Sequence, residues 1–279
     1  MAGSLVVVAT PIGNLADLSP RAVEVLCGVD LLLAEDTRHT GRLLAHIGSE
    51  VRQRSLHEHN ERDRIPEVLA ALDNGQRIAL VSDAGTPGVS DPGYRLVAAC
   101  VDAGVDVEVV PGPSAALAAL VVSGLPTDRV VFDGFLPRKG AARRERLADL
   151  ASERRTMVLF ASPHRIVDDL DDLMASLGSQ RRAALARELT KLHEQVLRGT
   201  LAELHARVGE GLRGEVTLVI GGAPDDDQPV IGDDELVARV RQLIATGVTK
   251  KSAIAQVAAA AGRPKREVYQ AVLDATDRP

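Results

Sequence analysis

The strongest constraint on the fold is an alternation between short, continuously apolar segments and longer stretches with helical spacing of apolar residues. In the first half of the chain the apolar segments are 5–9, 31–34, 78–81 and 105–110. The helical stretches that follow them are 21–27, 38–47, 94–103 and 114–122. Apolar runs without polar alternation are typical of strands covered on both faces. The first half is therefore predicted to be an α/β domain with a largely parallel sheet.

The alternation pauses at Leu125-Pro126-Thr127 and then resumes with apolar segments at 130–135, 157–161, 183–188 and 215–220, which predicts a second α/β domain. A polar stretch at 225–229 has the composition of a linker. The last segment, 236–279, carries eight Lys and Arg residues against three acidic ones. Its two short helical stretches, 249–260 and 265–273, flank a Gly-containing turn, as in helix-turn-helix units. The predicted organisation is two α/β domains, 1–125 and 126–224, and a small C-terminal helical segment within 225–279.

Composition excludes several classes of protein. The chain has 279 residues, 45% of them hydrophobic, which is enough for a core without disulfides, and it has only two cysteines. A net charge of −6 argues against a generic polyanion binder, and 2% aromatic residues cannot supply a surface for stacking bases. The longest apolar run, near 115–125, is too short to cross a bilayer, and no basic, cleavable leader pattern precedes the first strand. We therefore expect no membrane association and a cytoplasmic location.

Three loops that follow predicted strands are rich in Gly and Pro, at 10–14, 82–93 and 111–115. Ligands of open α/β sheets bind at the carboxyl ends of strands, so these loops are predicted to form a binding surface. None contains the Gly-x-Gly-x-x-Gly dinucleotide fingerprint or a Walker-type phosphate loop. Taken alone, each loop has a simpler interpretation as an ordinary turn. The simpler interpretation of Asp83, Asp91 and, outside these loops, Asp36 is a helix cap.

Charged clusters at 35–40 and 187–191 also follow predicted strands, and five basic residues lie among the nine positions 138–146. The ordinary interpretation is a cap, a surface ion pair or a solvated helix face. The functional interpretation is a reaction site and a phosphate-binding patch. The histidines at 57–61 lack the spacing of a metal-binding motif, so no metal is expected.

Taken together and in this order, the motifs resemble the ribosomal RNA small-subunit methyltransferase I family of the tetrapyrrole-methylase-like superfamily. The similarity runs from residue 5 to about 222 and is carried by segments 10–15, 17–18, 35–38, 57–61, 82–93, 111–115, 123–126, 134–137, 162–165 and 187–191. The resemblance implies a two-domain tetrapyrrole-methylase fold, also called a class III S-adenosylmethionine methyltransferase fold. It also implies that S-adenosylmethionine binds in the cleft between the two domains and that the protein forms a homodimer. The expected reaction is methylation of a cytidine 2′-oxygen in small-subunit (16S) rRNA.

By position in these motifs, the resemblance implies a set of cofactor-lining residues: Pro11, Asp83, Gly85, Thr86, Ser114, Ala115, Ala161, Ser162 and Val219. A ribose hydroxyl is a poor nucleophile, so a neighbouring side chain that accepts its proton would help. The candidates are Asp36, Glu188, Lys191 and His59. The residues expected to contact RNA are Arg38, Arg138, Lys139, Arg143, Arg144 and Arg165.

Three alternatives stay open at this point. The first is a methyltransferase of the same fold that acts on a tetrapyrrole carbon, against which the basic groups argue. The second is a DNA-binding regulator with a ligand-sensing α/β part, suggested by the C-terminal segment. The third, a nicotinamide-dependent oxidoreductase, is disfavoured by the missing fingerprint.

Overall fold

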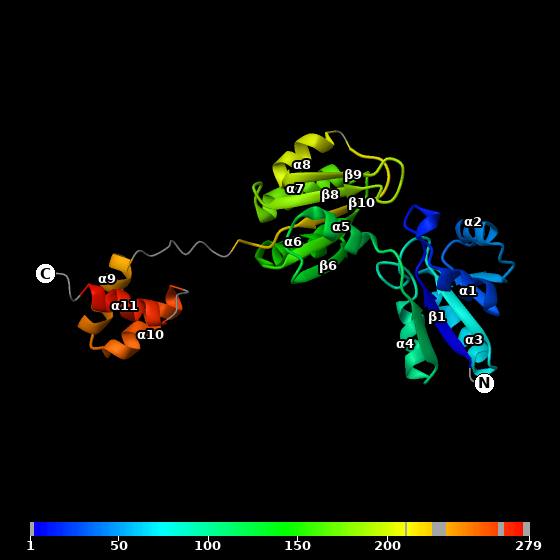
Figure 1. Ribbon diagram of the computed structural model, residues 1–279, viewed down its shortest axis with the longest axis horizontal. Helices are drawn as coiled ribbons and strands as arrows, with labels where there is room; N and C mark the ends of the chain where they lie inside the picture. The colour runs from blue at the N-terminus through cyan, green and yellow to red at the C-terminus, as the bar shows by residue number, and fades with distance from the viewer. Residues whose placement is uncertain (1–2, 210, 225–232, 262–264, 276–279) are drawn as a thin grey trace. The chain divides into compact units, whose positions relative to one another are not determined.

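The computed structural model describes residues 3–209, 211–224, 233–261 and 265–275. The chain forms two compact units, Met1–Gly222 and Ala223–Pro279 (Figure 1). The first unit contains two five-stranded sheets, and the second contains helices. The fold class predicted from the sequence, two α/β domains with a small C-terminal helical segment, is confirmed.

The first sheet is entirely parallel and has the strand order β3-β2-β4-β1-β5. Its strands are β1 (Ser4–Val8), β2 (Leu31–Ala34), β3 (Gln53–Ser55), β4 (Arg77–Val81) and β5 (Asp106–Val110). The connecting helices are η1 (Leu15–Asp17), α1 (Pro20–Gly28), α2 (Thr37–Ile47), α3 (Glu61–Asp73) and α4 (Tyr94–Asp102). Val6 of β1 packs against Leu26 of α1, whereas the preceding Leu5 packs in a separate cluster with Leu96 of α4. Successive residues of a strand point to opposite faces, so β1 has to be apolar throughout.

The second sheet is mixed and has the order β6-β7-β10-β8-β9. Its strands are β6 (Val130–Phe135), β7 (Thr156–Ala161), β8 (Arg182–Arg187), β9 (Gln195–Thr200) and β10 (Val216–Ile220). Strand β6 is parallel to β7, but β10 is antiparallel to both of its neighbours, β7 and β8. Helices α6 (Gly140–Ser152), α7 (Ile166–Leu177) and α8 (Leu201–Val208) share one apolar cluster on one face of this sheet.

Helix α5 (Ala115–Ser123) covers the other face of the second sheet. Its Ala119 and Leu120 pack with Val158 of β7 and Val219 of β10. The predicted boundary at 125 places this helix with the first sheet, whereas its packing places it with the second. The helix is apolar on every side, so its sequence does not indicate which sheet it covers.

The sequence pattern did not indicate β3, α3, β9, α8 or α9. Strand β9 is an edge strand with no fully buried residue, so it lacks the apolar run used to detect the others. Helix α8 begins with a capping box formed by Thr200 and Glu203. Cys100 is buried as a small apolar residue would be, but Cys27 is exposed at the end of α1.

The second unit has its own apolar core. Its helices are α9 (Asp233–Ala245), α10 (Lys250–Ala260) and α11 (Lys265–Asp274), and the core includes Leu236, Val240, Ile254, Val257 and Val268. The two predicted C-terminal helices are therefore present, while the predicted linker at 225–229 and turn residues 262–264 lie outside the described residues. Within those residues, no helix combines the length and hydrophobicity that a bilayer crossing requires.

Candidate active site

A hollow of about 590 Å³ in the first unit is lined by segments of both sheets. The first sheet contributes the ends of β2 and β4 and the loop that follows β4, including Asp83, Gly85 and Thr86. Ser114 and Ala115, at the start of α5, form part of the wall. The second sheet contributes Ala161 and Ser162 after β7. Seven of the nine residues predicted to hold a cofactor therefore line one hollow.

The two other predicted cofactor residues behave differently. Pro11 lines an adjoining hollow. Val219 has no exposed surface and packs in the core beneath α5. Val219 does not line the hollow because β10 runs antiparallel to β7: Ala161, at the carboxyl end of β7, pairs with Val216, at the start of β10. The residues of β10 that line the hollow are accordingly Val216 and Thr217, not Val219.

Backbone contacts fix the loops around the hollow. The amide of Thr10 donates to the carbonyl of Gly85 at 2.8 Å, and the amide of Gly85 donates to the carbonyl of Thr10 at 3.1 Å. Gly85 has a φ of 74°, a left-handed conformation that favours glycine. The side chain of Ser114 caps α5 by accepting from the amide of Leu117. The left-handed backbone therefore explains glycine at position 85, and the side-chain cap explains serine at position 114.

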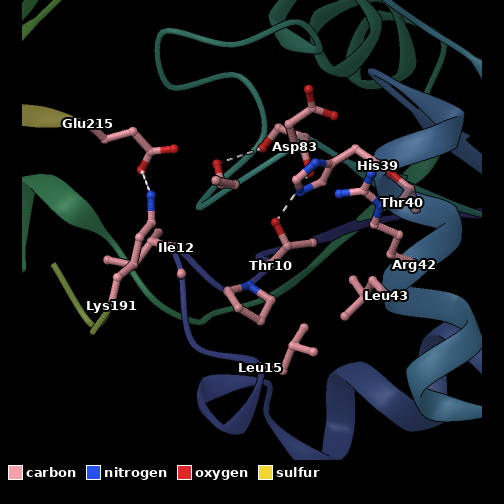
Figure 2. A pocket seen from close by; sticks show the side chains of 14 residues that line it. Thr10, Ile12, Leu15, His39, Thr40, Arg42, Leu43, Asp83, Lys191 and Glu215 are labelled. Atoms are coloured by element: carbon pink, nitrogen blue, oxygen red, sulfur yellow. Dashed lines mark hydrogen bonds and ion pairs between the residues drawn. The ribbon is translucent and has the colours of Figure 1, made fainter. Parts of the chain in front are cut away.

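A second hollow of about 330 Å³ adjoins the first (Figure 2). The two hollows share Ile12, Asp83, Ala84 and Glu215 as lining residues. The second hollow, but not the first, is also lined by His39 and Arg42 of α2 and by Lys191. The sequence analysis included His39 only within the charged cluster 35–40, and Glu215 only as the first residue of the apolar segment 215–220.

Lys191 is held at the wall of the second hollow by two carboxylates. Its Nζ lies 2.9 Å from Glu188 Oε1 and 3.2 Å from Glu215 Oε2, and Figure 2 shows the second pair. Glu188 and Thr190 have positive φ values of 52° and 66°, which non-glycine residues seldom adopt. Strained backbone of this kind clusters at functional sites. The turn at 188–191 is therefore built to place the ammonium of Lys191, which also lies against Gly13.

Four carboxylates, Glu35, Asp83, Asp91 and Glu215, line the larger hollow. Burial raises the pKa of Asp91 to about 6, and the charges of Glu35 and Asp83 add to this effect. Burial also raises the pKa of Glu35, helped by the charges of Asp83 and Asp36. This wall is anionic and partly shielded from water, which favours a cationic ligand. Glu35 and Asp91 are functional candidates that the sequence analysis did not assign to the cofactor.

Asp36 caps the start of α2 and pairs with Arg38. Its carboxylate accepts from the amide of Arg38 at 2.8 Å, and its Oδ2 lies 2.7 Å from Arg38 Nη2. The hydrogen bonds from Arg38 hold the pKa of Asp36 well below its usual range. Asp36 therefore stays ionised at neutral pH and is a weak proton acceptor.

The other candidate proton acceptors are also constrained. The hydrogen bond from Lys191 lowers the pKa of Glu188. Burial disfavours the charged form of Lys191, but the bonds to Glu188 and Glu215 outweigh burial and raise the pKa of Lys191. His59 is exposed in the turn before α3 and is not among the residues that line either hollow.

The residues predicted to contact RNA divide into two groups. Arg38, Arg138, Lys139 and Arg144 are exposed, and Arg165 donates to the carbonyl of Arg138 at 2.7 Å. Arg143 forms the second group, because it is buried rather than available to RNA. It is 6% exposed, and its guanidinium lies 2.8 Å from Asp169 Oδ1 and 2.6 Å from Asp172 Oδ2. It lies four residues before the buried Leu147 of α6 and therefore shares the inner face of that helix.

The chemistry of the larger hollow fits S-adenosylmethionine. Ala84, Ala115 and the rings of Phe135 and Phe160, whose centroids are 5.5 Å apart, provide apolar surface. The carboxylates provide charge opposite to that of a sulfonium and an ammonium. In the described part of the chain, no group of three His, Cys, Asp or Glu residues is arranged to hold a metal ion.

Comparison with known proteins agrees with this fold and site. Residues 4–205 match the tetrapyrrole (corrin/porphyrin) methylase family. A crystal structure of uroporphyrin-III C-methyltransferase from Thermus thermophilus in complex with S-adenosylhomocysteine superposes with a TM-score of 0.55 at 21% identity, covering 79% of this chain and 97% of that chain. The fold and site thus define a methyltransferase of the tetrapyrrole methylase class.

Two curated relatives narrow the class. Ribosomal RNA small subunit methyltransferase I of Synechocystis is 50% identical over 98% of both chains. The protein of the same name from Mycobacterium tuberculosis is 48% identical over 97% of this chain and 95% of its own. The chain belongs to the ribosomal RNA small subunit methyltransferase I family. This confirms the family predicted from the motifs and argues against the regulator and oxidoreductase alternatives.

Proposed function

We propose that this protein transfers the methyl group of S-adenosylmethionine to the 2′-oxygen of a cytidine in small-subunit (16S) rRNA. The observation that carries the proposal is the pair of adjoining hollows that share Asp83 and Glu215. The larger hollow suits a cationic, partly apolar cofactor. The second hollow places cationic side chains next to that cofactor. Family membership supports the choice of rRNA over a tetrapyrrole as the acceptor. Ribosomal subunits lie in the cytoplasm, where we place the activity.

S-adenosylmethionine supplies a methyl carbon that is already activated on a sulfonium, so the protein acts mainly by alignment. The 2′-oxygen forms a bond to this carbon while the carbon–sulfur bond breaks, and the electron pair of that bond stays on sulfur. The backbone and side chains of the loop after β4 and the start of α5 would hold the cofactor, with Asp83 and Asp91 offsetting its positive charge. Gly85 has no Cβ and so allows close backbone contact.

The hydroxyl must also lose its proton. Asp36 is held ionised with a low pKa and Lys191 is held protonated, so we assign them positioning roles: Lys191 beside the ribose and Asp36 at the start of α2. His39 is the one imidazole among the described residues that line the second hollow, and we assign it the proton-accepting role. Glu188 positions Lys191. His59 keeps only its sequence-based assignment.

Methyl transfer from labelled cofactor to purified small subunits and to naked small-subunit rRNA tests the function. We expect label on the ribose of a single cytidine, located by nuclease mapping. Absence of label from both substrates would rule the function out.

Three variants test the roles. We expect His39→Asn, Lys191→Ala and Asp36→Ala to lower the single-turnover rate at least tenfold, with little change in cofactor affinity measured by calorimetry, because these side chains lie outside the larger hollow. If the variants keep wild-type rates, these roles are wrong.

We also propose that the protein is a homodimer. Three exposed apolar side chains lie on the edge strand β5 and on α5, the helix that follows it in the chain: Val109 is 59% exposed, Leu117 64% and Val121 75%. Apolar residues this exposed on neighbouring elements suit a subunit interface. Light scattering should report twice the chain mass, and Leu117→Asp with Val121→Asp should give the monomer mass. A wild-type monomer would contradict the proposal.

A further inference from the structure

A third concavity, of about 790 Å³, opens at the edge of the second sheet where β7 and β8 end and β10 begins. We name it the Arg187–Arg213 groove. It is lined by the turn after β7, the first turn of α7, the end of β8 and the loop before β10: Pro163, His164, Val167, Asp168, Arg187, Gly211, Leu212 and Arg213. Pro163 also lines the cofactor hollow, and so does Gly214, the neighbour of Arg213. The groove is therefore continuous with the reaction site.

Arg187 is fixed within this groove. Its Nε donates to the carbonyl of Arg213 at 2.6 Å, which sets the plane of the guanidinium and leaves its two terminal nitrogens for another acceptor. No carboxylate in the described part of the chain forms an ion pair with Arg187 or Arg213. By contrast, Arg143 and Arg155 each pair with a carboxylate at 2.6 Å. Among the described residues that line the groove, Asp168 is the one acidic residue, against two arginines and His164.

A guanidinium held in one plane, with its terminal nitrogens available, can contact a phosphate group with two parallel hydrogen bonds. The neighbouring loops carry further positive charge. Arg165, which follows His164, donates to the carbonyl of Arg138 and so ties the turn after β7 to the basic loop at 138–139. On the other side, Arg187 precedes Glu188, which holds Lys191 at the second hollow.

We propose that the Arg187–Arg213 groove binds a backbone phosphate of the substrate RNA next to the nucleotide that enters the reaction site. This inference rests on the proposed function. Arg187 and Arg213 contact the phosphate, and they position the strand without reading its sequence. The anionic wall of the cofactor hollow repels phosphate, so the strand needs such a cationic anchor beside it.

Arg213→Ala and Arg187→Gln test the groove. We expect each to raise the KM for small subunits about tenfold and to reduce the slope of log affinity against log salt by about 1, as loss of one phosphate contact does. Cofactor affinity by calorimetry should stay at the wild-type value. Arg207→Ala is the matched control, because Arg207 also donates to a backbone carbonyl, that of Arg198, but lies outside the groove.

The outcomes separate this inference from the proposed function. Wild-type protein that methylates subunits, together with groove variants of unchanged KM and salt slope, overturns the groove alone. Groove variants that lose cofactor binding overturn it too, because the arginines would then support the cofactor loop. Wild-type protein that labels no rRNA overturns the function itself. Arg213→Glu provides a second check, since reversed charge should weaken subunit binding more than alanine does.

Discussion

At the scale of single residues, the site works by shifting the charge state of a few carboxylates. Asp36 and Asp91 lie on loops of the same sheet, yet the pKa of one is lowered by Arg38 and the pKa of the other is raised to about 6 by burial and by Glu35. Environment separates the two groups, so one is a permanent anion and the other titrates near neutrality.

The first prediction concerns cofactor binding. Asp91 becomes protonated as the pH falls through about 6, and its attraction for a cation is then lost. We expect the Kd for S-adenosylmethionine to rise several-fold between pH 8 and pH 5, and Asp91→Asn to flatten this dependence. Asp102→Asn, at the exposed end of α4, is the control. An unchanged pH profile in Asp91→Asn would contradict the assignment.

The same residue has a consequence for stability. Its folded-state pKa of about 6 lies above the ordinary aspartate value of 3.8, so its contribution to stability is full below about pH 4 and is lost as the pH rises through 6. Asp91→Asn should therefore raise the free energy of unfolding at pH 8 by about 1 to 2 kcal/mol, after discounting for partial exposure, and leave it nearly unchanged at pH 4. Denaturant unfolding at the two pH values measures this.

Residue-scale predictions from sequence failed where a side chain's direction decided its role. Arg143 and Arg144 are adjacent and equally basic, but one faces the core of α6 and the other faces solvent. A count of basic residues cannot separate them, whereas the helical spacing from Arg143 to Leu147 could have done so. The loops rich in Gly and Pro do line the two hollows, and the sequence could single them out because glycine and proline directly indicate special backbone conformations.

At the scale of elements, α3 and α4 hold the cofactor loop through one buried side chain. Glu61 is 3% exposed, and its Oε1 accepts from the amides of Gly93 and Leu96, both at 3.1 Å. Its Oε2 lies 3.3 Å from Arg95. Gly93 closes the loop that contains Asp83 and Asp91, so a carboxylate at the start of α3 fixes the end of the cofactor wall.

Replacing Glu61 should therefore affect both stability and binding. Glu61→Ala leaves two buried amides without an acceptor, and we expect a loss of about 2 to 4 kcal/mol in unfolding free energy and at least a tenfold weaker cofactor affinity. Glu61→Gln keeps one oxygen for the amides and should restore most of both. Calorimetry on the two folded variants checks this, and equal affinity in Glu61→Ala and wild type would exclude the positioning role.

At the scale of elements, the sequence indicated four of the five strands of each sheet and missed β3 and β9, but it predicted strand direction only for the first sheet. Every strand of the first sheet runs parallel, so the rule that ligands lie after strands applies throughout. In the second sheet β10 is antiparallel, so the part that reaches the site is its beginning. Strand direction depends on tertiary pairing, which the apolar run of β10 does not record.

At the scale of the whole molecule, the C-terminal unit is separable. It has its own core of α9, α10 and α11, and its exposed residues include Lys250, Lys251, Lys265 and Arg266. The unit therefore adds positive charge to an otherwise acidic chain.

A chain ending at residue 224 should keep wild-type cofactor affinity and melting behaviour but bind small subunits more weakly, with a shallower salt dependence because fewer phosphates are contacted. Calorimetry and filter binding measure the two properties separately. Charge-neutral variants of Lys265 and Arg266 in the full chain provide the control for truncation. Loss of cofactor binding in the truncated chain would show that the units are not independent.

The position of β10 between β7 and β8 sets an order of events during synthesis. Until the ribosome has released the chain through Ile220, the middle of the second sheet is missing, and so are Val216 and Thr217 at the cofactor wall. The first sheet can form early, because N-terminal parts fold first as the chain emerges. A nascent chain therefore has no complete methyl-donor site, and the newly made enzyme acquires its cofactor only after nearly four fifths of its length has left the exit tunnel.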